Sequence, residues 1–380
     1  MKQVDIFLTL LSIGWLLVSC EPGEVAPTIA FYHWQTELDL DPSETERLEA
    51  LGCKRLYVKF FDLVAEGDDL IPRAKLQVGT IPTDSLEIVP TLFLSNASMQ
   101  HLREQQAVDM DATARLVDRC RQLIGELWPG LDYRELQFDC DWTKQTRETF
   151  FAFLRQWRKV LDTKVVLSAT LRLHQYRYPE QTGVPPVDRV MLMYYNVGQL
   201  EEWSEENSIF SLAAAAPYLE TAAYPLPIDL ALPLFRWGVL FRNAKVVKLI
   251  TGLSPERLAD TAFFLPITVD LRPATREQSP TPAGQSKPAI ADATMVEQPA
   301  GSPRYLVRKS TYLDGYYLYA GDLLRLEAID SHLLLAAAQQ WQQRGVEAPR
   351  YLSFYHLDTE VLHSFTDENL RDCAQIWLAD

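Results

Sequence analysis

The sequence has little of several features that identify common classes of protein. Its six histidines show no paired spacing, so it contains no metal-binding motif, and nothing in it predicts a cofactor. Its five cysteines follow neither a zinc pattern nor the dense spacing of a disulfide scaffold, which leaves buried thiols or one disulfide as the alternatives for Cys53, Cys120, Cys140 and Cys373. Positive charge is also scarce, and the net charge of −15 disfavours non-specific binding to nucleic acid.

Beyond residue 20 the sequence also lacks any apolar run long enough to span a bilayer. Residues 6–18 are mostly apolar but short for a membrane span, and residues 17–20, Leu-Val-Ser-Cys, resemble a bacterial lipobox, in which the cysteine is lipidated. We therefore predict a lipoprotein signal peptide over 1–19, a lipid anchor at Cys20 and a linker over 20–27. The alternative is an ordinary signal peptide or membrane anchor. The resemblance implies a bacterial cell-envelope protein anchored to a membrane, and Glu21 after the cysteine favours the outer membrane or a periplasm-facing site.

Apolar strand-like runs alternate with helix-like segments through the rest of the chain. Eight such alternations predict a (β/α)₈ barrel over residues 28–380. The competing fold, an open doubly wound sheet, needs a glycine-rich turn after its first strand, and residues 33–38 contain no glycine. The expected strands are 28–34, 55–61, 87–94, 135–141, 164–173, 189–196, 228–237 and 350–357. The expected helices are 42–51 with a capping box at Ser43 and Glu46, then 111–127, 146–161, 207–219, 331–344 and 366–378.

One long insertion interrupts the pattern after the seventh strand. Residues 238–330 occupy a place where a barrel needs a single helix. We expect a hairpin over 238–249, a disordered linker over 273–303, which is rich in Pro, Ala, Thr and Gln, and short strands around Asp314-Gly315. Loops that follow barrel strands lie on the catalytic face, so the insertion is expected to cover the pocket or to dock a partner. A loop without function is the alternative.

The fourth expected strand carries the most informative pattern. Gln137, Asp139 and Asp141 occupy alternate positions and therefore share one face, opposite Leu136, Phe138 and Cys140. Carboxylates are seldom buried without a partner. Asp139 and Asp141 are therefore the candidate catalytic residues, at the end of an apolar strand and next to Trp142.

Polar and aromatic side chains also gather at the ends of the other strands, which converge on one cup in a barrel. Sugar rings stack on aromatic faces, and carboxylates accept hydrogen bonds from their hydroxyl groups. Trp34, Trp142, Tyr195 and Trp237 are the expected stacking platforms, with core packing as the alternative for each. The candidate substrate-binding residues are His33, Trp34, Lys59, Trp142, Arg172, Tyr194, Tyr195, Asn196, Asp229, Trp237 and His356.

Lys59 lies inside an apolar strand and needs a partner for its ammonium group. We predict that it points into the barrel and pairs with Asp139, either as a structural ion pair or in a catalytic role. Arg172 could join the same cluster.

The fourth-strand motif and residues 193–196, Met-Tyr-Tyr-Asn, resemble the chitinase-like barrel glycosidases that use substrate assistance. Their fourth strand reads Asp-x-x-Asp-x-Asp-x-Glu. Aligned on it, Asp139 and Asp141 match the second and third aspartates, whereas Leu136 and Thr143 replace the first aspartate and the catalytic glutamate. Tyr194 or Tyr195 could match the family tyrosine. The chain also resembles an uncharacterised family of bacterial barrel lipoproteins that implies no settled activity.

The missing glutamate separates two functions. A threonine hydroxyl is too weak an acid to protonate a leaving group, so hydrolysis would need another acid, with Asp141, Asp229 and Glu37 as candidates. The leading hypothesis is a glycoside-hydrolase-like envelope lipoprotein acting on an oligosaccharide or polysaccharide. The alternatives are a non-catalytic glycan-binding or scaffold lipoprotein on the same barrel, and a protein-interaction module that works through the insertion. The sequence identifies no protein partner.

Overall fold

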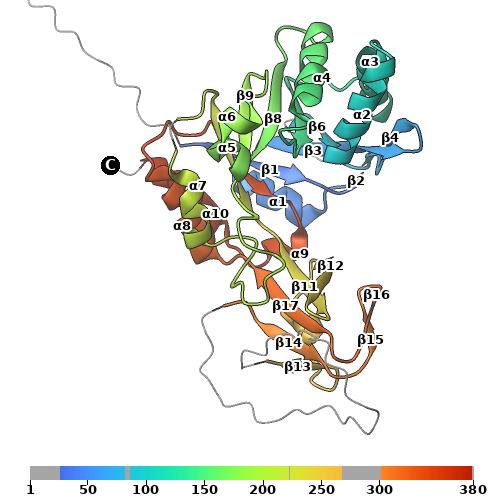
Figure 1. Cartoon of the computed structure of the whole chain (residues 1–380). Helices are drawn as coiled ribbons and strands as arrows, with labels where there is room; N and C mark the ends of the chain where they lie inside the picture. The colour runs from blue at the N-terminus through green and yellow to red at the C-terminus, as the bar shows by residue number, and fades with distance from the viewer. Residues whose placement is uncertain (1–25, 82–85, 222, 268–300, 379–380) are drawn as a thin grey trace, which may run out of the picture.

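Eight parallel strands close into a barrel in the computed structural model, which describes residues 26–81, 86–221, 223–267 and 301–378. The barrel order is β1-β18-β10-β9-β8-β7-β6-β3, and β3 pairs with β1 to close it (Figure 1). The predicted (β/α)₈ barrel is confirmed. Its strands are β1 (Thr28–His33), β3 (Arg55–Glu66), β6 (Glu87–Leu94), β7 (Glu135–Cys140), β8 (Val166–Arg172), β9 (Arg189–Met193), β10 (Ile228–Pro233) and β18 (Tyr351–Tyr355).

Helices cover the outside of the barrel. Helix α2 was not among the expected helices. The capping box of α1 is formed by Asp41 and Glu44, two residues earlier than the predicted Ser43 and Glu46. The helices are α1 (Pro42–Ala50), α2 (Asn96–Val108), α3 (Ala112–Leu127), α4 (Arg147–Val160), α5 (Leu173–Arg177), α6 (Pro179–Thr182), α7 (Leu212–Leu219), α8 (Ser331–Gln342), α9 (Thr359–Leu362) and α10 (Asp367–Gln375). The described residues also form two 3₁₀ helices, η1 (Pro255–Leu258) and η2 (Ile376–Leu378). Two small strand pairings lie beside the barrel: β4 (Asp69–Arg73) pairs with β3, and β2 (Glu37–Leu38) pairs with β5 (Gln77–Val78).

The alternation along β7 separates the two sides of the barrel wall. Phe138 faces outward, where its ring packs against Phe153 and Trp157 of α4. Gln137 faces inward, accepts a hydrogen bond from the Tyr32 hydroxyl at 2.6 Å and lies between Glu135 below and Asp139 above. Polar side chains therefore fill the barrel axis, and apolar ones fill the layer between strands and helices.

Buried charges close the amino-terminal end of the barrel. Arg55, the first residue of β3, pairs with Glu135 at 2.5 Å and with Glu87 at 2.7 Å. Arg189, the first residue of β9, pairs with Asp229 at 2.6 Å. Each cation has a carboxylate partner, as buried charges require, so this end is a plugged floor.

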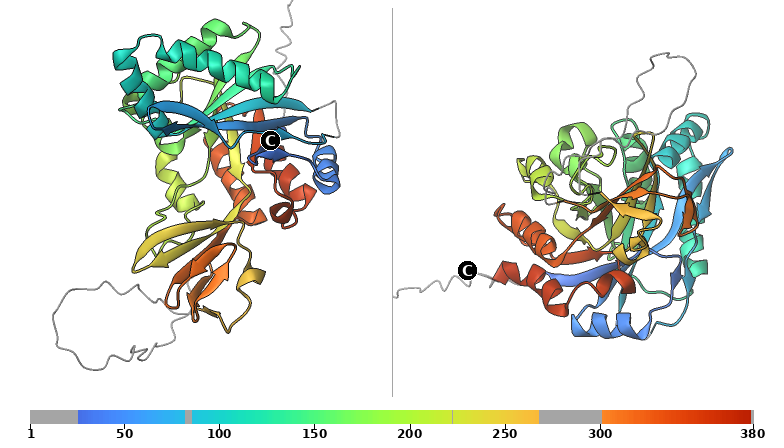
Figure 2. Two further views of the ribbon diagram at one scale, coloured as in Figure 1. Left: turned by 90° about the vertical axis from the view of Figure 1, so that its right-hand side faces the viewer. Right: turned by 90° about the horizontal axis from the view of Figure 1, so that it is seen from below.

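The insertion after β10 forms a second unit. Five antiparallel strands lie in the order β12-β11-β17-β14-β13, and a two-stranded hairpin, β15–β16, lies beside them. This sheet extends away from the barrel (Figure 1; Figure 2, left) and has its own core, which includes Leu240, Ile250, Leu313, Leu318 and Leu324. The strands are β11 (Arg236–Arg242), β12 (Lys245–Thr251), β13 (Phe264–Pro266), β14 (Arg304–Val307), β15 (Thr311–Leu313), β16 (Tyr316–Leu318) and β17 (Leu323–Ala328).

Both predicted turns of the insertion are present. Asn243 and Ala244 connect β11 to β12 with positive φ angles, and Asp314 and Gly315 connect β15 to β16 in the same way. The seventh expected strand, however, is two strands: β10 ends at Pro233 and β11 begins at Arg236.

Several predictions fall on other parts of the chain. The signal peptide and Cys20, and most of the 273–303 linker, lie outside the described residues. None of the helices in the described ranges is long and apolar enough to cross a membrane. The alternatives for the cysteines were buried thiols or one disulfide. The structure has buried free thiols at Cys53, Cys120, Cys140 and Cys373.

Candidate functional site

A cavity of about 500 Å³ opens at the carboxyl ends of the barrel strands. Its wall includes residues from the barrel strand ends and, through β11 and β12, from the insertion. Seven of the predicted site residues line it, namely Trp34, Asp139, Arg172, Tyr195, Asn196, Trp237 and His356. The other lining residues are outside the list of predicted site residues, although Arg236, Tyr355 and Asp358 lie at strand ends that were expected to converge on the cup. They are Gln35, Phe93, Phe235, Arg236, Thr251, Gly252, Tyr355, Asp358 and Val361.

An ion pair forms the base of the cavity. Asp139 is buried, and its Oδ1 accepts hydrogen bonds from the Thr170 hydroxyl at 2.6 Å and from Arg172 at 3.0 Å. The cation that pairs with Asp139 is therefore Arg172, and the prediction that Lys59 fills this role is wrong. A carboxylate can accept about four hydrogen bonds, so Asp139 keeps capacity for a ligand.

Two tyrosines lie beside this ion pair. The rings of Tyr195 and Tyr355 are 5.4 Å apart, and burial raises the pKa of both phenols above their usual range. Arg172 lowers the pKa of Tyr195, in opposition to the burial effect, through a hydrogen bond and its charge. Both phenols are therefore neutral hydroxyl groups at physiological pH.

Half-buried aromatic rings form the sides of the cavity. Trp34 lies 5.6 Å from Tyr355 and 6.5 Å from Phe93 between ring centroids, and Phe235 lies 5.2 Å from Trp237. Phe93 is the penultimate residue of β6, so its position relative to the strand end was a signal in the sequence that pointed to the cup.

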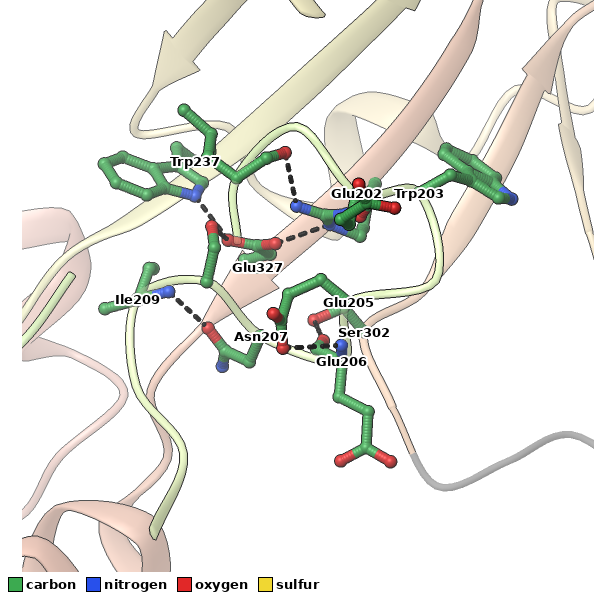
Figure 3. A network of polar contacts seen from close by, with 12 residues as sticks. Glu202, Trp203, Glu205, Glu206, Asn207, Ile209, Trp237, Ser302 and Glu327 are labelled. Carbon is green, nitrogen blue, oxygen red and sulfur yellow. Dashed lines mark hydrogen bonds and ion pairs between the residues drawn. The ribbon is translucent and has the colours of Figure 1, made fainter. Parts of the chain in front are cut away.

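A buried network holds Trp237 in place (Figure 3). Its indole nitrogen donates to Glu327 Oε2 at 2.6 Å, and the Ser208 hydroxyl donates to the same oxygen at 2.6 Å. Arg325 donates to the other carboxylate oxygen of Glu327 at 2.5 Å and to the backbone oxygens of Glu202 and Leu200. The loop after β9 and the insertion sheet are thus tied together behind the indole ring.

Two histidines lie close together at the rim. His356 lines the cavity, whereas His33 is buried and is not part of the lining. Burial and the neighbouring His356 lower the pKa of His33 to about 4, and burial also lowers the pKa of His356. His33 is therefore uncharged at neutral pH.

Besides His33, Lys59 and Asp141, three predicted site residues do not line the cavity. Trp142 is fully buried, its indole nitrogen donates to the backbone oxygen of Thr182, and its ring stacks on Phe150, so it is a core residue. Tyr194 points outward to Gln340 of α8, to which its hydroxyl donates at 2.7 Å. Asp229 is the second residue of β10 and belongs to the charged floor at the opposite end of the barrel.

Two further predictions about charged groups are corrected. The ammonium group of Lys59 is 3.2 Å from Asp62 and not paired with Asp139. Asp141 follows the end of β7, is exposed, lies 3.6 Å from His174 and is not among the lining residues. Glu37, the third candidate acid, is exposed on β2.

The positions that correspond to the glycosidase motif differ in their surroundings. Leu136 is buried in the wall, and Thr143 is exposed beyond the end of β7. Of the two candidate tyrosines, Tyr195 is the one that faces the cavity. The chain therefore presents one aspartate and one tyrosine of that motif to the cavity.

No family model and no curated protein matches the sequence. Solved structures with distant similarity include the spore cortex-lytic enzyme SleL of Bacillus cereus (12% identity, TM-score 0.46, 94% of this chain and 75% of that chain). They also include a chitinase from Rhizomucor miehei (12%, 0.45, 93% and 100%) and a glycoside hydrolase family 18 N-acetylglucosaminidase from Paenibacillus barengoltzii (12%, 0.47, 93% and 100%). The chain is thus distantly similar in structure to chitinase-like glycoside hydrolases. At this distance the similarity assigns no reaction to it.

Proposed function

We propose that the cavity binds a carbohydrate, an oligosaccharide or the end of a polysaccharide. The observation that supports this is the combination of half-buried aromatic rings with the Asp139–Arg172 pair at the base of one open cavity. Ligand pockets commonly pair apolar walls with a few fixed polar groups. Aromatic rings offer flat apolar faces, while Asp139 accepts hydrogen bonds and Arg172 and the neutral tyrosines donate them.

Binding without hydrolysis is the function that the geometry supports best. Position 143, where the resemblance places the general acid, holds an exposed threonine, and Asp141, Asp229 and Glu37 lie outside the cavity lining. Hydrolysis by two carboxylates needs an acid that reaches the leaving oxygen and a second carboxylate on the other side of the bond.

Hydrolysis remains the second candidate because of Asp358. This carboxylate lines the cavity together with Asp139, so a pair of acidic residues is present. Asp358 already accepts the backbone N–H of Val361 as the cap of α9. One oxygen of this carboxylate is therefore already engaged in the helix cap.

Tryptophan fluorescence of the purified full chain tests the proposal. Trp34 and Trp237 line the cavity, so oligosaccharides that bind there are expected to change the emission, with a parallel assay for new reducing ends. Asp139→Asn is expected to weaken binding about tenfold or more, because it removes a charged hydrogen-bond acceptor. Asp141→Asn is the matched control, since its carboxylate is exposed and outside the lining.

The outcomes separate the two candidates. Saturable binding without new reducing ends supports a binding protein. New reducing ends that disappear in both Asp139→Asn and Asp358→Asn support the hydrolase. If no oligosaccharide in a broad panel changes the emission, or if both Asp139→Asn and Asp141→Asn bind normally, the cavity is not the carbohydrate site.

We also propose that Cys20 anchors the chain to a membrane of the cell envelope, on the basis of the lipobox-like residues 17–20. Palmitate labelling in a bacterial host is expected for the natural sequence and not for Cys20→Ala. Equal labelling of the two would reject the anchor.

A further inference from the structure

The β15–β16 hairpin carries a row of tyrosines on one face. Tyr312 lies directly opposite Tyr317 in the register of the two strands, with ring centroids 5.0 Å apart, and Tyr319 continues the row at 4.9 Å from Tyr317. We call these three residues the tyrosine triplet. Five of the sixteen tyrosines of the chain lie within residues 305–319. Tyrosine is therefore far more frequent in this segment than in the chain as a whole.

The tyrosine triplet faces solvent. Strand alternation turns Leu313 and Leu318 into the core of the insertion and leaves Tyr312, Tyr317 and Tyr319 outside. Their exposures are 73%, 44% and 51%. Within the described ranges, five aromatic side chains are exposed, and this hairpin supplies four of them. A contiguous exposed patch of this kind marks an interaction site more often than scattered apolar residues do.

Cations lie against the same hairpin. The guanidinium of Arg242 is 4.3 Å from the Tyr319 ring centroid, and the ammonium of Lys248 is 4.6 Å from that of Tyr316. In the structure the insertion runs from the start of β11 to the end of β17, residues 236–328. This range contains twelve Lys and Arg against nine Asp and Glu, a net charge of +3 within a chain of net charge −15. The insertion is therefore the part of the molecule that attracts an anionic partner, while the remainder repels it.

Strand β12 connects this hairpin to the cavity. Lys248, in contact with Tyr316, lies three residues before Thr251, which lines the cavity together with Gly252. Three residues of a strand span about 10 Å. β12 therefore leads from the cavity lining to the hairpin, which it meets at Tyr316.

We propose that the tyrosine triplet and Lys248 bind a negatively charged polysaccharide whose end occupies the cavity. This proposal rests on the proposed function of the cavity for the class of ligand. It adds that the ligand is a polymer rather than a short saccharide, that it is anionic, and that the insertion supplies a second contact surface. Binding at two linked surfaces raises the affinity for a polymer well above that for a fragment.

An anionic membrane surface is the other partner that such a patch could attract. Surface-bound membrane segments bury Trp, Phe and Leu from an amphipathic helix, whereas this patch is a β-hairpin whose exposed rings are tyrosines, each with a hydroxyl group. Its connection to the cavity through β12 favours a chain-like ligand.

Affinity measurements on the full chain with polygalacturonate, neutral dextran and galacturonate trisaccharide test the proposal. Tyr312→Ala/Tyr317→Ala is expected to lower the affinity for polygalacturonate about tenfold or more and to leave trisaccharide binding unchanged. Tyr312→Phe/Tyr317→Phe keeps the rings and is expected to bind normally, and Tyr178→Ala, an exposed tyrosine on the barrel, is the control. Lys248→Gln is expected to reduce the dependence of polymer binding on salt.

Several results would overturn the proposal. One is equal polygalacturonate binding by the natural sequence and the double alanine variant, and another is equal binding of dextran and polygalacturonate by the natural sequence. A third is binding to phosphatidylglycerol vesicles that is stronger than binding to polygalacturonate and is lost in the double alanine variant, which would assign the patch to membranes. Circular dichroism confirms that each variant is folded. If the natural sequence does not bind the trisaccharide but the double alanine variant still loses polymer binding, the proposed function of the cavity is rejected and the proposed role of the tyrosine triplet stands.

Discussion

Trp237 and Glu327 lie opposite each other on β11 and β17 and are joined by a hydrogen bond from the indole nitrogen to the carboxylate at 2.6 Å. Glu327 is completely buried and also binds Arg325 and Ser208. One carboxylate therefore positions a ring of the cavity wall, neutralises a buried guanidinium and fixes the loop after β9. The insertion is thereby part of the site rather than an appendage beside it.

Glu327→Gln is expected to lower the free energy of unfolding by about 3 kcal/mol, because Arg325 would remain buried without its counter-charge. Urea denaturation measures the change, and Glu201→Gln, an exposed glutamate in the same loop region, is the control. The Trp237 emission of the folded variant is also expected to change. Equal stability of Glu327→Gln and Glu201→Gln would show that the network does not hold the insertion.

Two glycines are expected to respond in opposite directions to alanine. A Cβ at Gly198 would lie 2.7 Å from the Ser208 Cα and 3.0 Å from the backbone oxygen of Asn207, so the loop beside Glu327 would have to move. Gly125 lies in α3 with nothing within 4 Å of its would-be Cβ.

Gly198→Ala is therefore expected to destabilise the protein by about 1–3 kcal/mol, and Gly125→Ala to stabilise it by about 0.5–1 kcal/mol, since alanine is the better helix former. Thermal unfolding measures both. A Gly198→Ala variant at least as stable as the natural sequence would mean that this loop repacks without cost.

The strand pattern and the strand-end rule predicted much of the barrel and of the site. The alternation on β7 located Asp139 in the barrel interior, and the ends of β8, β9 and β18 supplied Arg172, Tyr195 and His356 to the cavity. These predictions succeeded because direction along a parallel strand and side-chain alternation are both written in the residue order.

The errors concern features that residue order alone does not contain. Trp142 and Tyr194 have rings that suit either a pocket or a core, and helices α4 and α8 decide for the core. Asp229 lies near the start of β10, which the sequence merged with β11 into a single strand. The predicted partner of Lys59 was wrong: β3 shifts its register against β6 between Lys59 and Phe61, and the ammonium group lies beside Asp62.

The Lys59–Asp62 pair is expected to be asymmetric in its response to mutation. The Lys59 side chain is 10% exposed and that of Asp62 is 24% exposed. Asp62→Asn leaves the more buried charge without a partner and is expected to cost about 1–2 kcal/mol, whereas Lys59→Met leaves a carboxylate that water can reach and is expected to cost less. Urea denaturation of the two single variants and the double variant measures the difference. A larger loss in Lys59→Met would mean that its ammonium serves another partner.

Acid is expected to destabilise the protein through His33. Its pKa is about 4 in the folded state, against an ordinary value of 6.5, so the unfolded chain binds a proton in this interval and the folded one does not. The stability from the uncharged histidine is complete above pH 6.5 and is lost as the pH falls to about 4, a change of about 3 kcal/mol. Asp229 has the opposite effect on stability, because burial raises its pKa to about 6. As the pH falls, the folded state takes up this proton before the unfolded chain does, which stabilises the folded state.

His33→Gln isolates the histidine from these other groups. Asp229 and His356 are present in both proteins, so their contributions largely cancel in the difference between the two unfolding free energies. That difference is expected to shift in favour of His33→Gln by about 3 kcal/mol between pH 7 and pH 4. Urea denaturation at half-unit pH steps measures it. Parallel stability curves over this interval would show that His33 is protonated in the folded state, and the floor carboxylates would then have to account for any acid transition.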